Sequence, residues 1–384
     1  MKQIPYATQW IDTADIQAVN KVLKSAYLTQ GPVVEEFEKK IAEYCGAKYA
    51  VAVNSGTSAL HIACLAAGIS SGDEVVTSPI TFAASANCVL YCGARPVFAD
   101  INEETICLDV NEIAKKLSPK TKAIIPVDFA GHPADLAEIH KLARERGLVI
   151  IEDAAHAIGA RYRGEKIGSG KYADMTALSF HAVKHITTGE GGMVLTNRED
   201  YYRKLKLFRT HGISRDLKFV DPWYYEMKEL GFNYRLSDIQ CALGLSQLKK
   251  LPHFLSRRKQ IVTKYNEAFS VDKRLSPLVQ KPYVVSANHL YVLQFDSSNL
   301  KLSRSQIFNE YRRHGILVNV HYLPVYWHLY YKKLGYCKGF CPKAERYYEK
   351  AITLPLYPKM SDQDVKRVIR VTEKIMKMPK RGMA

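Results

Sequence analysis

Long apolar runs are missing from this chain of 384 residues. No run reaches the roughly 18 consecutive apolar residues of a membrane-spanning helix, so we expect no membrane span. The opening segment MKQIPYATQWIDTAD also lacks the apolar core of a signal peptide, and we expect a cytoplasmic protein. Neither disorder nor a fibrous architecture fits the composition, since 47% of the residues are hydrophobic and 24% are charged.

Cysteine pairs of the CxxC type are also absent, although the chain has eight cysteines. Two wider CxxxC spacings join Cys88 to Cys92 and Cys337 to Cys341. No further cysteine or histidine cluster stands at a spacing that would complete a metal site, so we expect no metal. We interpret the cysteines as reduced thiols, mostly in apolar or helical stretches, of a cytosolic protein.

Acidic residues are in deficit, and the formal net charge is +17 at pH 7. The excess is uneven, because residues 1–100 hold 7 basic and 9 acidic side chains and residues 301–384 hold 18 and 6. The basic region ends in the tail KIMKMPKRGMA. Such a surface can be simply solvated, can attract an acidic small molecule such as a nucleoside diphosphate, or can bind nucleic acid. Helix-turn-helix, zinc-finger and RNA-binding signatures are missing, which makes nucleic acid the least favoured of the three.

Short β-branched segments alternate with helical segments from residue 12 to about residue 250. We expect strands at 49–53, 74–78, 96–100, 123–127 and 148–152, and helices at 58–68, 82–92 and 135–147. This alternation is typical of an α/β protein with a largely parallel sheet covered by helices.

The later part of the chain follows a mixed pattern. Its helical and strand-like segments are 236–251, 256–270, 289–295, 303–315, 316–320 and a final helix from Ser361 to Lys377. We predict a large domain over residues 1–250, with an N-terminal arm, and a smaller α+β domain over residues 251–384. No low-complexity linker separates them, so the two domains should share an interface.

Three segments carry the residue types that chemistry needs. The strand-like LVIIED ends in Asp153, at the sheet edge where α/β proteins bind ligands. Lys184 follows another apolar strand and precedes the glycine-rich TTGEGG, which fits a buried reactive amine better than a surface lysine. Upstream, NSGTS (54–58) begins a helix, and the free amides of a first helical turn favour a phosphate.

A phosphate cradle, a carboxylate at a strand end and a lysine are together what pyridoxal 5'-phosphate (PLP) needs. The lysine amine condenses with the aldehyde, the carboxylate keeps the ring nitrogen protonated, and the helix start holds the phosphate. The signatures GxGxxG and GxxxxGK(S/T) are absent, which weakens a dinucleotide or ATP interpretation.

The chain resembles the sugar aminotransferases of the DegT family, which are PLP enzymes of fold type I. The likeness runs from Tyr6 to the final helix. It is carried by LTQGP (28–32), NSGTSAL (54–60), SPITFAASAN (78–87), EDAAHAIGA (152–160), SFHAVKHITTGEGG (179–192), GFNYRLSDIQCALG (231–244) and VHYLPVY (320–326). Within the family it points to enzymes of the pseudaminic acid type, through DPWYYEMKELGFNYRLSDIQ, LGLSQLKKL and VHYLPVYWHLYY.

The resemblance implies a role for each matching residue of the cofactor site. Lys184 is the catalytic residue and binds PLP covalently, and Asp153 pairs with the ring nitrogen. Phe82 covers one face of the ring and His156 the other. The residues that hold the phosphate would be Thr57, Ser58 and Ser179, with Asn233 reaching in from the second subunit. Contacts to the sugar nucleotide would come from Tyr6, Tyr27, Leu28, Thr29, Asn233, His321 and Tyr322.

These assignments have plainer alternatives. Phe82 would otherwise be a core residue, His156 a turn histidine and Asn233 a helix cap. Family members that act as dehydratases have histidine in place of the lysine, so Lys184 favours transamination.

The implied reaction moves an amino group from L-glutamate to C4 of a UDP-linked 4-keto-6-deoxy-N-acetylhexose, in a homodimer with shared active sites. One alternative keeps the chemistry but uses a GDP-linked, dTDP-linked or 3-keto sugar. A more distant alternative is a basic DNA-binding regulatory protein.

Overall fold

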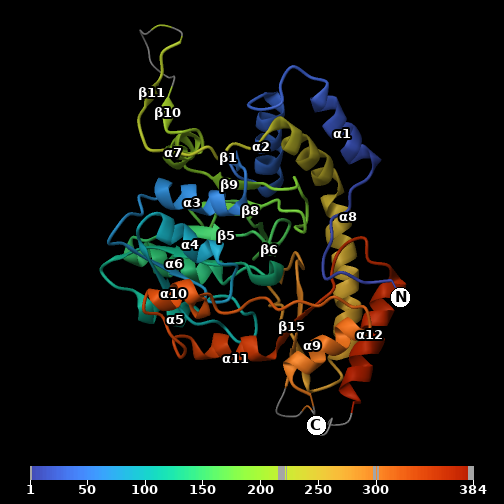
Figure 1. Cartoon of the computed structure of the whole chain (residues 1–384). Helices are drawn as coiled ribbons and strands as arrows, with labels where there is room; N and C mark the ends of the chain where they lie inside the picture. The colour runs from blue at the N-terminus through green and yellow to red at the C-terminus, as the bar shows by residue number, and fades with distance from the viewer. Residues whose placement is uncertain (1, 215–220, 222, 297–299, 301, 379–384) are drawn as a thin grey trace.

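The computed structural model describes residues 2–214, 221, 223–296, 300 and 302–378 (Figure 1). Pro222, in one of the stretches that carry the family likeness, and the end of the basic tail, 379–384, lie outside the described residues. Among the described residues, no helix is both long and apolar enough to cross a bilayer. The same residues include no group of three or more side chains arranged to hold a metal ion.

A seven-stranded sheet forms the centre of the larger part of the molecule. In spatial order its strands are β1 (Tyr49–Val53), β9 (Gly192–Thr196), β8 (Met175–Ser179), β5 (Val149–Asp153), β4 (Thr121–Ile125), β2 (Glu74–Thr77) and β3 (Arg95–Phe98). Strand β9 runs antiparallel to both neighbours, and the pairs from β8 to β3 are parallel. The predicted α/β class with a mostly parallel sheet is therefore confirmed.

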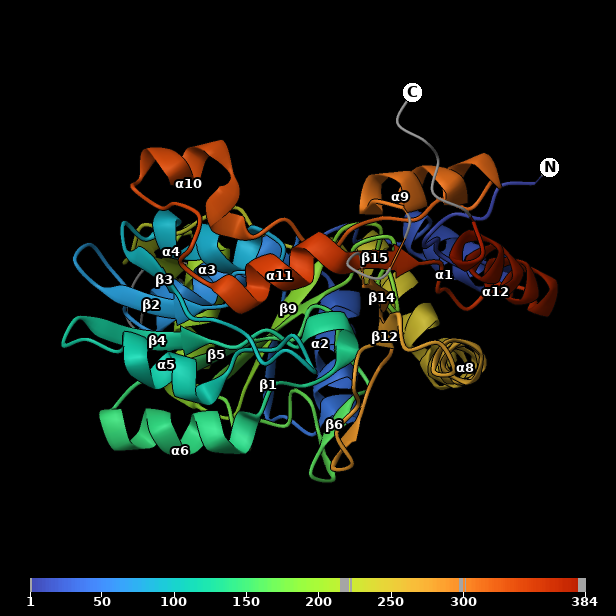
Figure 2. The same ribbon diagram turned by 90° about the horizontal axis from the view of Figure 1, so that it is seen from below.

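Helices cover both faces of this sheet. In Figure 2, α3 (Gly56–Ala66) and α4 (Ala84–Tyr91) lie on one face and α6 (Leu136–Arg146) on the other. The remaining helices of residues 1–210 are α1 (Thr13–Leu23), α2 (Pro32–Cys45), α5 (Val110–Lys116), the 3₁₀ turn η1 (Phe129–Gly131) and α7 (Glu199–Arg209). Strands β8 and β9 are buried along their whole length, which explains why they appear in the sequence as continuous apolar runs.

A smaller α+β region packs beside the sheet, at the right of Figure 2. Its sheet contains β12 (Leu275–Pro277), β14 (Tyr291–Phe295) and β15 (Ala351–Leu354). Helices α9 (Arg304–Arg313) and α12 (Asp362–Met376) belong to this region. The segments η2 (Val325–Trp327), α10 (Leu329–Lys333) and α11 (Pro342–Lys350) instead extend over the large sheet and contribute Tyr326, Tyr331 and Tyr347 to its core. Two further small sheets are formed by β6 (Arg161–Tyr162), β7 (Glu165–Lys166) and β13 (Val284–Val285), and by β10 (Ile213–Ser214) and β11 (Glu226–Met227).

The N-terminal arm joins this smaller region rather than the large sheet. Ile4 is 1% exposed and belongs to the same apolar core as α12 and β14. Its amide donates to Gly315 O, and its carbonyl accepts from the amide of Leu317. This anchoring matters for the site because it places the next part of the arm, with Tyr6, beside residues 319–322.

Helix α8 differs from the sequence-based expectation. The two predicted helical segments, 236–251 and 256–270, are one continuous helix, Asp238–Phe269, with Pro252 inside it. Proline removes a backbone hydrogen bond and disfavours a helix interior. The neighbouring side chains Leu251 and Phe254 are buried, and their packing holds the helix across this position. The predicted division between residues 250 and 251 falls within α8 and stays a prediction.

The segment 316–320 also differs from its strand-like pattern. It forms isolated bridges, between Ile316 and Ile4 and between Asn319 and Thr353, and no extended ladder. An open backbone at this place leaves Asn319, His321 and Tyr322 available to line a cavity.

Candidate active site

A cavity of about 750 Å³ lies where β5 and β8 end and α3 begins. The carboxyl ends of parallel strands and the start of a helix meet here, which is the usual ligand position in α/β proteins. Of the sequence-predicted site residues, ten line this cavity: Tyr6, Thr57, Ser58, Phe82, Asp153, His156, Ser179, Lys184, His321 and Tyr322.

Lys184 lies in the turn that follows β8. Its amide donates to His181 O at 2.9 Å, and the chain returns to β8 where the Thr188 amide donates to Phe180 O at 3.0 Å. Desolvation lowers the pKa of its amine to about 8, against an opposing effect of the Asp153 carboxylate. With this pKa roughly one amine in ten is neutral at pH 7, far more than for an ordinary lysine, and the neutral form is the one that a nucleophile or general base needs.

Asp153 is the last residue of β5 and is 6% exposed. Its Oδ2 accepts a hydrogen bond of 2.6 Å from Ser85 Oγ, and its Oδ1 accepts one of 3.2 Å from the Ala155 amide. Burial raises the pKa of this carboxyl, while the two hydrogen bonds and the Lys184 charge oppose that rise. The carboxylate is thus held in place and is close enough to Lys184 for the two groups to shift each other's pKa.

The first turn of α3 provides a cradle for an anion. Ser55 caps the helix by accepting from the Ser58 amide at 3.1 Å. The amides of Gly56 and Thr57 have no protein acceptor among the described residues. Together with the positive end of the helix dipole they favour a phosphate.

Two glycines let this turn approach the strands. A Cβ added at Gly56 would stand 2.9 Å from Ser179 Cβ, and one at Gly192 would stand 2.3 Å from Ser55 O. The Ser179 hydroxyl therefore lies directly beside the free amides of α3. The structure has the close-packed backbone and the hydroxyl that a phosphate group requires.

Phe82 is 64% exposed although it is a large apolar side chain. It lines the cavity just before α4, and its ring centroid lies 6.5 Å from that of Tyr322. The plainer alternative, that Phe82 is a core residue, does not fit this exposure. An aromatic ring held open to a cavity suits stacking on a planar ligand.

His156 lies on the wall of the same cavity and is 6% exposed. Its Nε2 is 3.4 Å from the Tyr322 hydroxyl, and its ring packs on His289 at 4.3 Å. Its buried Nδ1 has no protein partner among the described residues. Burial, together with the charge of Lys184, holds the pKa of His156 well below its ordinary value, so the ring is neutral.

Tyr6, His321 and Tyr322 form a further part of the cavity wall. The Tyr6 and His321 rings are 5.6 Å apart, and His321 Nδ1 is paired with Thr353 Oγ1 at 2.8 Å. Burial lowers the pKa of His321 to about 3, so this side chain is a neutral polar contact. The arm residue Tyr6 reaches this wall because Ile4 anchors the arm on the C-terminal region.

Four predicted residues do not line this cavity in their own chain: Tyr27, Leu28, Thr29 and Asn233. Tyr27 and Leu28 are 58% and 46% exposed, and the Asp238 amide of α8 donates to Leu28 O. Asn233 is exposed, and its carbonyl accepts from Asn54 Nδ2 at 3.4 Å. All four residues are exposed, and of the four only Asn233 contacts a described residue of the cavity wall, Asn54.

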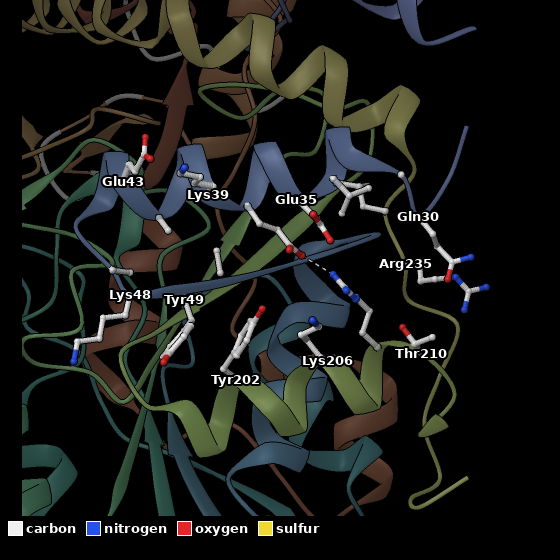
Figure 3. Close-up of a pocket in the computed structure, with 18 residues that line it drawn as sticks. Gln30, Glu35, Lys39, Glu43, Lys48, Tyr49, Tyr202, Lys206, Thr210 and Arg235 are labelled. Carbon is white, nitrogen blue, oxygen red and sulfur yellow. Dashed lines mark hydrogen bonds and ion pairs between the residues drawn. The ribbon is translucent and has the colours of Figure 1, made fainter. Parts of the chain in front are cut away.

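A second cavity, of about 490 Å³, lies between α2 and α7 beside β1 (Figure 3). Figure 3 shows charged side chains of both signs around it, among them Glu35, Lys39 and Lys206, and an ion pair joins Arg209 to Glu38. Gln30 and Gly31 line it directly after the predicted segment Tyr27–Thr29. That segment therefore borders the second cavity.

Sequence reasoning missed several residues of the first cavity. Ser85 holds Asp153 but stands in an apolar helical stretch, and the spacing of the sequence does not indicate its partner. His289 and Asn319 line the cavity from loops of the C-terminal region, and no local motif marks them. His181, two residues after Ser179, also lines the cavity.

Comparisons with known proteins identify the family of this chain. The sequence profile of the DegT/DnrJ/EryC1/StrS aminotransferase family matches residues 9–373. The spore coat polysaccharide biosynthesis protein SpsC of Bacillus subtilis is 42% identical over 97% of each chain. The UDP-4-amino-4,6-dideoxy-N-acetyl-beta-L-altrosamine transaminase of Campylobacter jejuni is 40% identical over 99% of each.

Solved structures share the whole fold. Helicobacter pylori PseC, an aminotransferase of pseudaminic acid biosynthesis, superposes with a TM-score of 0.91 at 35% identity, covering 98% of this chain and 99% of that one. The PLP form of the putative sugar aminotransferase Spr1654 from Streptococcus pneumoniae gives 0.90 at 33% identity, covering 97% and 99%. The residues of this cavity fit PLP. They provide an anion cradle at the start of α3, the buried carboxylate of Asp153, the exposed ring of Phe82 and, in Lys184, an amine with a lowered pKa.

Proposed function

The chain belongs to the DegT/DnrJ/EryC1/StrS family and is a PLP-dependent sugar aminotransferase, and from that premise we propose its reaction. L-Glutamate donates an amino group, which is placed on C4 of a UDP-linked 4-keto-6-deoxy-N-acetylhexose. Family membership favours this enzyme over the alternative of a DNA-binding regulator.

The observation that carries the proposal is the shared cavity of Lys184, Asp153 and the start of α3. A lysine with a pKa of about 8 stands near a buried carboxylate, and a helix start with free amides is beside Ser179. PLP, when bound, supplies an electron sink for charge that develops on the reacting carbon. The residues of this chain supply the rest.

Each residue then has a stated task. Lys184 anchors the cofactor and, as a neutral amine, moves a proton at Cα of glutamate and at C4 of the sugar. Asp153 keeps a positive charge on the ring nitrogen, since an opposite charge in contact favours the charged form. The Gly56 and Thr57 amides and Ser179 bind the phosphate, and Phe82 and His156 would cover the two faces of the ring.

The choice of sugar rests on the relatives. The Campylobacter jejuni relative is named for a UDP-linked 4-amino sugar, and its 40% identity spans 99% of both chains. The Bacillus subtilis relative, 42% identical, is named for spore coat polysaccharide biosynthesis. Because the name of this second relative specifies neither a nucleotide nor a keto position, a GDP-linked, dTDP-linked or 3-keto sugar is the second candidate.

We further propose a homodimer that shares its active sites. Tyr27, Leu28, Thr29 and Asn233 are surface residues that do not line the cavity of their own chain, and from a second copy they would complete it. The hairpin of β10 and β11 projects from the body in Figure 1, and this segment contains exposed apolar side chains. Trp223 is 76% exposed, Met227 66% and Leu230 77%, which favours a protein surface as their partner. A cytoplasmic location is also proposed, since the eight free cysteines suit a reducing compartment.

The test is a substrate panel with the purified holoprotein. The protein is first converted to its amino form with L-glutamate, and UDP-, GDP- and dTDP-linked 4-keto and 3-keto sugars are then added separately. Return of the PLP absorbance with the UDP-linked 4-keto-6-deoxy-N-acetylhexose, and an amine at C4 by NMR, is the expected result. A faster return with another nucleotide or with a 3-keto sugar would replace the proposed substrate.

A further inference from the structure

The aspartate that begins α8 does not line the active-site cavity, yet it is completely buried. Asp238 is the first residue of this helix. Its Oδ2 accepts from the Gly31 amide at 2.8 Å, and its Oδ1 accepts from the Val33 amide at 3.0 Å. A buried carboxylate is costly unless its oxygen atoms are paired, so both hydrogen bonds are needed where it lies. The side chain thus holds a stretch of chain that lies 207 positions earlier in the sequence.

This carboxylate supplies the cap that α2 lacks. The N-cap of α2 is Gly31, which has no side chain that could accept from the first helical turn. Asp238 takes this role from another helix, because the two amides that it binds belong to the start of α2. It also lies at the start of α8, so the positive ends of both helices favour its negative charge. Without the carboxylate, the start of α2 would be uncapped.

The chain before α2 is packed directly against Asp238. A Cβ added at Gly31 would stand 2.5 Å from Tyr27 Cβ and 2.7 Å from Asp238 Oδ1. The preceding residue, Gln30, has a φ of 54°, in the left-handed region that residues other than glycine seldom adopt. Such a conformation persists only where the surrounding contacts hold it. The hydrogen bonds from Gly31 and Val33 to Asp238 provide such contacts.

The same helix start also holds the residues before this bend. The Asp238 amide donates to Leu28 O at 3.0 Å, and Thr29 pairs with Ser237 in an isolated antiparallel bridge. The backbone and the side chain of Asp238 therefore fix residues 28–33 together. Leu28 is nevertheless 46% exposed, so a fixed backbone presents this side chain to the outside.

We propose that Asp238 is a positioning residue for the sugar-nucleotide side of the reaction. Its carboxylate keeps residues 27–31 in the conformation in which residues 27–29, from a second copy of the chain, contact the sugar nucleotide. This inference rests on the proposed function, which gives residues 27–29 that role. A segment that is ordered before binding loses less conformational entropy when the ligand binds. Loss of the carboxylate should therefore weaken binding of the sugar nucleotide and spare the half-reaction with L-glutamate.

The kinetics of the two half-reactions test this role. Asp238→Ala should raise the KM for the UDP-linked 4-keto-6-deoxy-N-acetylhexose by about tenfold or more, as expected for the loss of a hydrogen bond to a charged group. Its single-turnover rate with L-glutamate should stay within about threefold of the parent rate. Asp238→Asn keeps one accepting oxygen and should lie between Asp238→Ala and the parent. Tyr27→Ala removes a side chain of the positioned segment and should raise the same KM.

Asp15→Ala is the matched control. Asp15 is also an aspartate buried against α8, and its Oδ2 accepts from Gln247 Nε2 at 2.8 Å and pairs with Lys250 Nζ at 2.5 Å. Both partners lie further along α8 than Asp238. The control should lose stability but keep the parent KM for the sugar nucleotide. An equal rise of KM in both alanine variants would indicate a general loosening of α8 and would overturn the proposal.

Hydrogen exchange of the free holoprotein needs no substrate and therefore separates this inference from the proposed function. The Gly31 and Val33 amides should exchange about tenfold faster or more in Asp238→Ala than in the parent, and Asp15→Ala should leave their exchange unchanged. If Asp238→Ala does not fold, Asp238→Asn and Asp15→Asn are compared in its place. Unchanged exchange in the Asp238 variant would overturn the proposal whatever the substrate is.

Two kinetic results would also overturn the proposal. Faster exchange without a rise of KM, or an unchanged KM in Tyr27→Ala, would mean that the positioned segment does not serve the sugar nucleotide. A parent protein that is inactive with the UDP-linked sugar would instead contradict the proposed function. The KM comparison is then made with the best substrate of the panel, and the same outcomes decide the role of Asp238.

Discussion

Ser85 Oγ donates a hydrogen bond of 2.6 Å to Asp153 Oδ2, inside the buried wall of the active-site cavity. Thr81 Oγ1 stands 2.7 Å from the same serine oxygen. Since Ser85 has a single proton, Thr81 donates to Ser85 and Ser85 donates to Asp153. This chain orients the carboxylate and opposes the rise in its pKa that burial causes.

Ser85→Ala should slow the half-reaction with L-glutamate. A hydrogen bond to a charged group is worth about 1.5–3 kcal/mol, and its full loss in the barrier corresponds to about ten- to a hundred-fold in rate. Without it the pKa of Asp153 rises further, so the acidic limb of the rate profile should move to higher pH. The measurement is the single-turnover rate at which the PLP absorbance is lost, recorded from about pH 5 to pH 9 so that the acidic limb of the profile is covered.

Two further variants should bracket the effect of Ser85→Ala on the rate. Asp153→Asn should keep its colour and fold but react more slowly than Ser85→Ala, because it removes the charge itself. Thr81→Val should have the smaller effect, since Thr81 does not touch Asp153. A Ser85→Ala rate within about threefold of the parent rate, well under the tenfold change expected at least, would show that Ser85 does not position Asp153, provided that the pH dependence of the rate is also unchanged.

Attachment of PLP to the apoprotein should depend on pH with a midpoint near 8. The Lys184 amine must be neutral to react, and desolvation lowers its pKa to about 8. The rate should therefore rise through pH 8 and level off above it. Because the Asp153 carboxylate opposes that shift, Asp153→Asn should move the midpoint to lower pH. A midpoint near the ordinary lysine value of about 10.4 would contradict the desolvated site.

Glu152 should make the protein less stable as the pH rises toward 7. It is buried next to Asp153, accepts from Thr176 Oγ1 at 2.6 Å, and has its pKa raised to about 7, chiefly by desolvation. A carboxyl whose folded pKa is raised contributes stability that is complete below its unfolded pKa and is lost as the pH passes the folded value. The free energy of unfolding in urea should fall between about pH 4.5 and pH 7 through this group, and Glu152→Gln should flatten that fall. An equally steep fall in the variant would assign the dependence to other groups.

Asn233→Ala should weaken PLP retention without unfolding the protein, by about ten- to a hundred-fold if one hydrogen bond to the phosphate is lost. A mixing experiment decides whether the residue acts across the dimer. Lys184→Ala and Asn233→Ala proteins are each defective, but a mixed dimer has one site with Lys184 from one chain and Asn233 from the other. Unfolding and refolding the two together should restore about a quarter of the sites if dimers form at random. No restoration, or full activity in a monomer, would contradict a shared site.

The fold was largely predictable because the spacing of apolar residues in its core segments indicates which are strands and which are helices. The expected strand at 49–53 matches β1 residue for residue, since the buried YAVAV run is short, β-branched and bounded by turns. The final helix was also placed well, because Ser361 with Asp364 forms a capping box that marks its start. The two helical segments expected at 236–251 and 256–270 are one helix, α8, which continues through Pro252 because tertiary packing outweighs the local cost of proline.

The site was predictable in part. Lys184, Asp153 and the start of α3 stand at strand ends and a helix start, which sequence patterns mark, and a parallel sheet brings such ends to one edge. Ser85 and His289 carry no such mark, because their roles come from contacts between distant segments.

The most direct test of the account is to reduce the holoprotein with borohydride and map the modified lysine. The reduction fixes PLP covalently on the lysine that holds it, and peptide mass spectrometry identifies that residue. The cavity formed by Asp153, Phe82 and the start of α3 predicts the adduct on Lys184 in every loaded chain. An adduct on any other lysine, or a Lys184→Ala protein that still becomes labelled, would contradict the site described for this aminotransferase.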